Sequence, residues 1–127
     1  MKASITFLLV MLSAVATPAS AEWTEIGKNQ AGTQYFIDLT TLKKSARPRA
    51  WVMASFSKRS ELGIFSAKTL DEIDCSEGKI RALARRYYTE PMGGGTVESD
   101  DRLGEWRYVT PNSAEEHIAS ILCRDNR

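Results

Sequence analysis

An apolar segment close to the start of the chain determines how much of the chain is left to fold. Met1 and Lys2 give a positive start, residues 5–15 are almost wholly apolar, and Ala19-Ser20-Ala21 supplies a small-x-small cleavage motif. These three regions are typical of a secretory signal peptide. The apolar run is too short to span a bilayer as a helix, which argues against the alternative of an uncleaved anchor. We therefore expect residues 1–21 to be removed and residues 22–127 to fold as one exported domain.

The expected export also limits where the protein works and what it binds. The residue after the predicted cut is Glu22, whereas a bacterial lipoprotein carries a cysteine there. The sequence therefore predicts a periplasmic or secreted protein without a stable membrane anchor. Removal of Lys2 leaves 16 basic residues against 16 acidic ones. This balance argues against nucleic acid as the main partner, because phosphate binding requires a basic excess or stripe.

The chain contains two cysteines, Cys75 and Cys123. In an oxidising compartment an even pair most simply forms a disulfide. Closing a loop of about fifty residues would stabilise the domain by roughly 4 kcal/mol in the chain-entropy treatment. The alternative is a redox-active pair, but redox cysteines usually stand in a Cys-x-x-Cys motif and these do not.

Alternating and β-branched segments predict a largely antiparallel sheet. The expected strands cover residues 22–26, 34–38, 49–58, 64–70 and 106–109. Residues 49–58 are apolar on both faces, which indicates a central strand. Lys79–Tyr88 fits either helical or strand spacing, and the turn that follows it favours a strand. We expect a short turn after Asp38, over residues 39–42, and a charged loop over residues 98–104.

The end of the chain carries the clearest helix signal. Ser113 and Glu116 form a capping box, and Ile118, Ile121 and Leu122 fall on one helical face. Cys123 follows directly, so a disulfide would tie this helix to the sheet. The predicted fold class is α+β: an antiparallel sheet of about six strands with a C-terminal helix packed on one face, and one disulfide.

The residue types that usually carry catalysis or bind metals do not occur in recognisable patterns. The single histidine, His117, has no partners at metal-ligand spacing, and no G-x-S-x-G motif accompanies it. Residues 93–95 are glycines, but no Lys-Ser or Lys-Thr follows, so a hairpin turn is expected in place of a phosphate loop. A short acidic run lacks the spacing of a calcium loop and is expected to be a solvated loop; it comprises Asp71, Glu72, Asp74 and Glu77. We predict no enzyme activity, cofactor or metal.

Basic residues are concentrated in one segment, at Lys79, Arg81, Arg85 and Arg86. In a regular strand Lys79, Arg81 and Arg85 would share a face. Such a stripe would hold an anionic partner: a glycan sulfate, an acidic protein surface or an anionic lipid. The alternative interpretation is an exposed sheet face whose charge is balanced by the nearby acidic residues.

Several pieces of the sequence, in order, resemble the surface-adhesin protein E family of bacterial envelope proteins. They are Trp23, Tyr35-Phe36-Ile37-Asp38 with Leu42, Trp51, Ser66-Ala67-Lys68-Thr69-Leu70, Asp74-Cys75, Arg81, Tyr87, Trp106 with Tyr108-Val109, Pro111-Asn112-Ser113 and Cys123. The resemblance covers nearly all of residues 22–127.

The resemblance implies an antiparallel sheet with a C-terminal helix, a disulfide between Cys75 and Cys123, and self-association as a homodimer. The family's namesake adheres to host matrix and serum proteins, and no catalytic residues are carried over. We therefore expect an exported, non-enzymatic binding module whose partner is a host-matrix or envelope protein. The alternative is a structural or stress-related periplasmic protein with an envelope partner.

Overall fold

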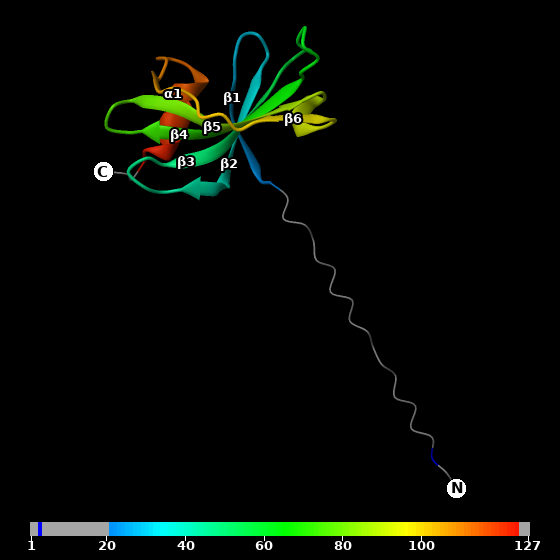
Figure 1. The fold of residues 1–127 in the computed structure, drawn as a ribbon, viewed down its shortest axis with the longest axis horizontal. Coiled ribbons are helices and arrows are strands. Elements are labelled where there is room, and N and C mark those ends of the chain that lie inside the picture. Colours follow the sequence, from blue (N-terminus) through cyan, green and yellow to red (C-terminus); the bar gives the residue numbers. More distant parts are fainter. Residues whose placement is uncertain (1–2, 4–20, 125–127) are drawn as a thin grey trace.

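The computed structural model describes residue 3 and residues 21–124. The predicted signal peptide therefore lies almost wholly outside the described residues. Seven strands, one short 3-10 helix and one α-helix form in the described part (Figure 1). In chain order they are β1 Trp23–Lys28, β2 Gln34–Lys43, β3 Arg49–Ser55, β4 Ser66–Asp74, β5 Lys79–Tyr88, η1 Pro91–Gly93, β6 Val97–Asp100, β7 Arg107–Tyr108 and α1 Ala114–Leu122.

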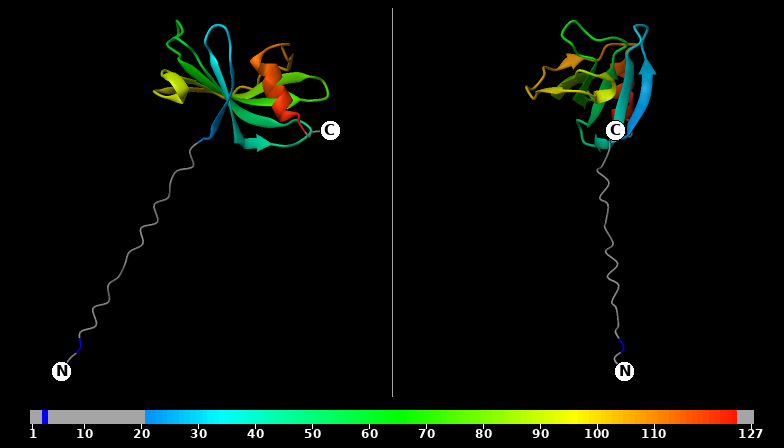
Figure 2. Two further views of the ribbon diagram at one scale, coloured as in Figure 1. Left: turned by 180° about the vertical axis from the view of Figure 1, so that it is seen from behind. Right: turned by 90° about the vertical axis from the view of Figure 1, so that its right-hand side faces the viewer.

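The strands form one antiparallel sheet in the order β1-β2-β3-β4-β5-β6. The short β7 pairs with the beginning of β5, while β6 pairs with its end. Helix α1 lies across one face of this sheet, as the view from behind shows (Figure 2). The predicted α+β class, with a C-terminal helix on one face of an antiparallel sheet, is thus confirmed.

The core lies between α1 and the sheet. Its buried residues are Ile37, Ala50, Val52, Ile73, Ile80, Ile118 and Leu122. The central strand β3 contributes Ala50 and Val52, and the helix contributes Ile118 and Leu122. Burying a large aliphatic side chain of this kind stabilises a fold by about 1.5–3 kcal/mol, so docking the helix supplies a substantial share of the domain's stability.

Both ends of α1 are held by the bonds that the sequence predicts. The Ser113 hydroxyl accepts a hydrogen bond from the Glu116 amide at 3.3 Å. The Glu116 carboxylate in turn accepts from the amide of Asn112, one residue before the expected partner. At the other end Cys123 forms a disulfide with Cys75, with 5.8 Å between their α-carbons. The helix therefore begins at a capping box and ends at the cross-link to the β4–β5 turn.

Two local predictions are wrong. Residues 39–42 do not form a separate turn, because β2 continues to Lys43 through an irregular stretch after Asp38. The charged loop expected over residues 98–104 holds only for residues 101–104, because Val97–Asp100 form strand β6. As an edge strand β6 pairs only with β5, so Val97, Glu98 and Ser99 stay exposed and leave no apolar alternation in the sequence. The preference for a strand over a helix at Lys79–Tyr88 is confirmed.

Strand β5 contains a bulge that decides where its basic side chains point. Leu70 pairs with Ala84 and the next residue, Asp71, pairs with Ala82, so the register skips Leu83. An extra residue in one strand moves each side chain beyond it to the face opposite the one it would have in a regular strand. Arg81, before the bulge, and Arg85, after it, therefore lie on opposite faces of the sheet.

Candidate binding site

All three tryptophans lie on the face of the sheet opposite α1, which we call the helix-free face. Cross-strand pairing joins Trp23 to Asp38 and Asp38 to Trp51. Paired residues share a face, and neighbouring residues such as Ile37 and Val52 point to the helix instead. Trp106 joins this face by packing against Arg81 just before β7. None of the three rings is fully buried.

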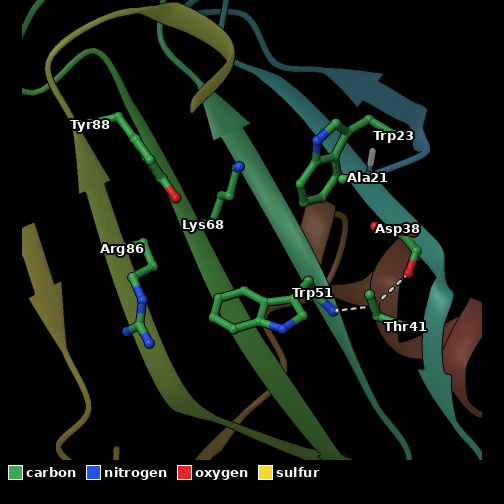
Figure 3. Close-up of a pocket in the computed structure, with 8 residues that line it drawn as sticks. All are labelled: Ala21, Trp23, Asp38, Thr41, Trp51, Lys68, Arg86 and Tyr88. Atoms are coloured by element: carbon green, nitrogen blue, oxygen red, sulfur yellow. Dashed lines mark hydrogen bonds between the residues drawn. The ribbon is translucent and has the colours of Figure 1, made fainter. Parts of the chain in front are cut away.

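A groove of about 310 Å³ opens on the helix-free face across β1 to β5 (Figure 3). We call it the tryptophan groove. Its lining residues are Ala21, Trp23, Asp38, Thr41, Trp51, Lys68, Arg86 and Tyr88. Ring faces and cations thus alternate around one hollow, an arrangement that suits a ligand with a flat apolar surface and a negative charge.

Two cations of the groove rest on aromatic rings. The Lys68 ammonium lies 5.4 Å from the centre of the Trp23 ring and 4.9 Å from that of the Tyr88 ring. The Arg86 guanidinium lies 5.7 Å from the centre of the Trp51 ring and also pairs with Asp101. Figure 3 shows the Lys68 side chain extending between Trp23 and Tyr88. Both cations are therefore positioned by packing as well as by charge.

The irregular stretch of β2 fixes one wall of the groove. The buried Asp38 carboxylate accepts bonds from the Thr40 amide at 3.0 Å and the Thr40 hydroxyl at 2.5 Å through the same oxygen. The Thr41 hydroxyl donates to the Asp38 carbonyl at 2.6 Å and accepts from the Trp51 amide at 2.9 Å. These bonds replace the regular ladder between β2 and β3 and hold the backbone that carries Trp51.

The other half of the helix-free face is a paired cluster around Trp106. Arg81 forms an ion pair with Glu72 at 2.8 Å, and its guanidinium carbon lies 4.3 Å from the centre of the Trp106 ring. Arg47 lies 5.3 Å from the same ring and pairs with Asp74. Each cation here has an acidic partner, so this cluster stabilises the sheet surface and leaves less charge for a ligand.

The four predicted basic contact residues do not form one stripe. Lys79, Arg81 and Arg86 lie on the helix-free face, whereas the bulge turns Arg85 to the helix face. Lys79 rests on the Tyr108 ring at 5.0 Å, and Arg85 donates to the Arg102 carbonyl at 3.1 Å. The expectation that Lys79, Arg81 and Arg85 share a face is therefore wrong, because it assumed a regular strand. Their contact with a partner stays a prediction.

The predicted acidic loop is also different in the structure. Asp71 and Glu72 lie within β4, and Asp74 ends it. Asp71 is buried on the helix face, and this burial raises its pKa to about 6 in spite of a hydrogen bond from Thr69. Asp71 lines a second hollow of about 470 Å³ that also includes Arg107 and Glu115. Those two residues pair with each other, so their charges are already satisfied.

The remaining sequence candidates carry no site in the structure. His117 is exposed on α1, and residues 93–95 belong to the connection between β5 and β6. Within the described residues, no group of three or more His, Cys, Asp or Glu side chains could hold a metal. Sequence reasoning missed Lys68 and the gathering of the tryptophans. Only the strand register reveals them, since these residues come from different strands.

The fold and this surface define a small, disulfide-linked α+β domain with one open sheet face. Residues 23–124 match the family described as surface-adhesin protein E, and the chain belongs to this family. No helix in the described part of the chain is long and apolar enough to cross a bilayer. No protein of curated function is detectably similar in sequence.

Solved structures of Haemophilus influenzae protein E share the fold. Crystal form II has a TM-score of 0.66 at 14% identity, with 84% of this chain and 91% of that chain covered. The selenomethionine form has a TM-score of 0.64 at 14% identity, with 87% and 94% covered. Protein E from non-typeable H. influenzae has a TM-score of 0.56 at 15% identity, with 85% and 79% covered.

Proposed function

We propose that this chain is an exported, non-enzymatic binding module that contacts a protein of the host matrix or of the cell envelope. Membership of the surface-adhesin protein E family supports this function. The observation that carries it is the helix-free face, where three tryptophans lie beside Lys68, Arg81 and Arg86. Tryptophan, tyrosine and arginine are the residues most enriched where protein interfaces gain their affinity.

The proposed location follows from the first twenty-one residues. Cleavage after Ala21 would release a domain that starts at Glu22, immediately before β1. The mass of the mature protein tests this cleavage. Protease accessibility on intact cells then separates the two kinds of partner: surface exposure favours a host protein, and a purely periplasmic pool favours an envelope protein.

Two adjacent arginines offer a sharp test of the binding face. Arg86 lies on the helix-free face and Arg85 on the helix face. Because both are arginines, reversing either charge changes the net charge by the same amount, and only the face differs. We expect Arg86→Glu to lower the affinity for a matrix or envelope protein by about tenfold at low salt, and Arg85→Glu to change it much less. Affinity is measured against purified extracellular-matrix, serum and envelope proteins, with thermal unfolding as the check on folding.

Three results would contradict the proposal. Equal losses in the two variants would indicate an effect of net charge and not of one face. A larger loss in Arg85→Glu would move the contact surface to the helix face. Absence of binding to every protein in the panel by the parent chain would remove the proposed function itself.

A further inference from the structure

Lys68 differs from Arg86, the other cation of the tryptophan groove, because it has no acidic partner. Within residues 21–124, no carboxylate oxygen lies within 4.0 Å of its ammonium, whereas Arg47, Arg81 and Arg86 all have one. Within the same residues, the Lys68 ammonium also donates no hydrogen bond to a protein acceptor. The Lys68 ammonium rests on the Trp23 and Tyr88 rings. Its three donors are therefore available to an anion that enters the groove.

The neighbouring η1 segment fixes the position of the Lys68 side chain. Its side chain passes close to Gly93 of η1, where an added β-carbon would come within 2.6 Å of the Lys68 Cε atom. The Gly93 amide donates to the Ser66 hydroxyl at 2.8 Å, which holds η1 against the start of β4. A lysine enclosed in this way loses little conformational freedom when it binds an anion, because the freedom is already lost on folding.

The rest of the groove offers ring faces and one spare acceptor. Trp23, Trp51 and Tyr88 present flat apolar surfaces around Lys68. Asp38 accepts both of its hydrogen bonds through one carboxylate oxygen, so its second oxygen can accept a hydroxyl. The ligand that fits has a flat apolar face, a negative charge and hydroxyl groups within a volume of about 310 Å³.

An extended peptide fits this groove poorly. A peptide that joins a sheet binds through the backbone groups of an edge strand. The strands under the groove that carry Trp51 and Lys68 are β3 and β4, and each already has partners on both sides. A ligand on this face is therefore held by side chains alone, which suits a sugar ring better than a main chain.

We propose that the tryptophan groove binds an acidic saccharide, a sugar ring that carries a carboxylate or a sulfate. The apolar C–H face of the ring stacks on Trp51 and Trp23. The anionic group binds the Lys68 ammonium, with Arg86 beside it, and a ring hydroxyl donates to Asp38. The groove lies within the face proposed to contact a protein, but saccharide binding and protein binding are measured with different ligands, so either proposal can fail without the other.

The experiment compares two lysines that each rest on a tyrosine ring. Lys68 lies over Tyr88 inside the groove, and Lys79 lies over Tyr108 outside it. Calorimetric titration uses the oxidised chain from residue 22 with a heparin hexasaccharide, which carries uronate and sulfate groups, and with neutral maltohexaose. We expect Lys68→Gln to weaken heparin binding by about tenfold or more, as loss of a charged hydrogen bond does, and Lys79→Gln to have less than about a twofold effect.

A second pair of variants keeps the test valid if Lys68→Gln does not fold. Trp23→Ala in the edge strand removes a groove wall, and Trp106→Ala removes a ring of the same face outside the groove. We expect only Trp23→Ala to weaken heparin binding. Equal losses from Lys68 and Lys79, equal affinity for maltohexaose, or no heparin binding would each overturn the proposal. So would a Lys68→Gln variant that binds heparin normally but changes the self-association measured by sedimentation, because a second copy would then occupy the groove.

Discussion

At the scale of single residues, Asp71 makes the domain's stability depend on pH. Its folded pKa of about 6 lies above the ordinary value of 3.8, mainly because burial disfavours the charged form. The folded state thus holds the proton more tightly than the unfolded chain does. The resulting stability is fully present below about pH 4 and is lost as the pH rises through 6.

We expect Asp71→Asn to stabilise the protein at pH 7.5 and to match it at pH 4. The shift corresponds to about 3 kcal/mol as an upper bound. It already includes the Thr69 hydrogen bond, Arg107 and Arg85, which lower the pKa, and Glu115, which raises it. Urea unfolding between pH 4 and 7.5 measures it. Glu61→Gln, in an exposed loop, should follow the parent's pH profile. An Asp71→Asn profile parallel to the parent's would show that Asp71 ionises normally.

Gly93 and Gly63 separate the cost of backbone conformation from the cost of crowding. Their φ angles are 76° and 79°, a region that L-residues rarely adopt, but only Gly93 has a side chain against it. Gly63→Ala should cost about 1–2 kcal/mol from the backbone alone. Gly93→Ala should cost more, because its methyl group also displaces Lys68. Equal melting temperatures in the two variants would show that Lys68 moves aside without cost.

At the scale of elements, the disulfide is the cross-link between α1 and the sheet. Cys75 directly follows β4 and Cys123 directly follows α1, and the two cysteines are 48 positions apart in the sequence. We expect Cys75→Ser to lower the free energy of unfolding by about 2–5 kcal/mol, because the unfolded chain gains freedom. Chemical unfolding of the variant and of the reduced parent should give the same loss. A melting temperature that is indifferent to reductant would contradict this role.

The elements that the sequence predicts well are those with local signals. The helix has a capping box, an apolar stripe and a cysteine within eleven residues, Ser113 to Cys123, and all three features occur in the structure. Strand β6 is not predicted from the sequence, because an exposed edge strand needs no apolar alternation. The burial of Asp71 is not predicted either, because its sequence context resembles that of the neighbouring acidic residues. The bulge at Leu83 has no local signal, and it alone transfers Arg85 to the other face.

At the scale of the whole molecule, the candidate site depends on register and not on any one segment. Trp23, Trp51, Lys68 and Tyr88 come from β1, β3, β4 and β5. Their alternation within each strand is visible in the sequence, but which alternating set faces the helix depends on pairing between distant strands. The family resemblance therefore predicts the architecture, whereas the groove appears only when the strands are aligned.

One apolar core joins α1 to the sheet, and this arrangement predicts how the molecule unfolds. The buried cluster includes residues of β2, β3, β4, β5 and α1, so no element of the core can detach without exposing the others. The tryptophans lie on the opposite face and report on the sheet independently of the helix. We expect the oxidised domain to unfold in one transition, with coincident curves from far-ultraviolet circular dichroism and tryptophan fluorescence. A fluorescence change at lower denaturant would show that the helix-free face loosens before the core, and the tryptophan groove would then not be a rigid, preformed site.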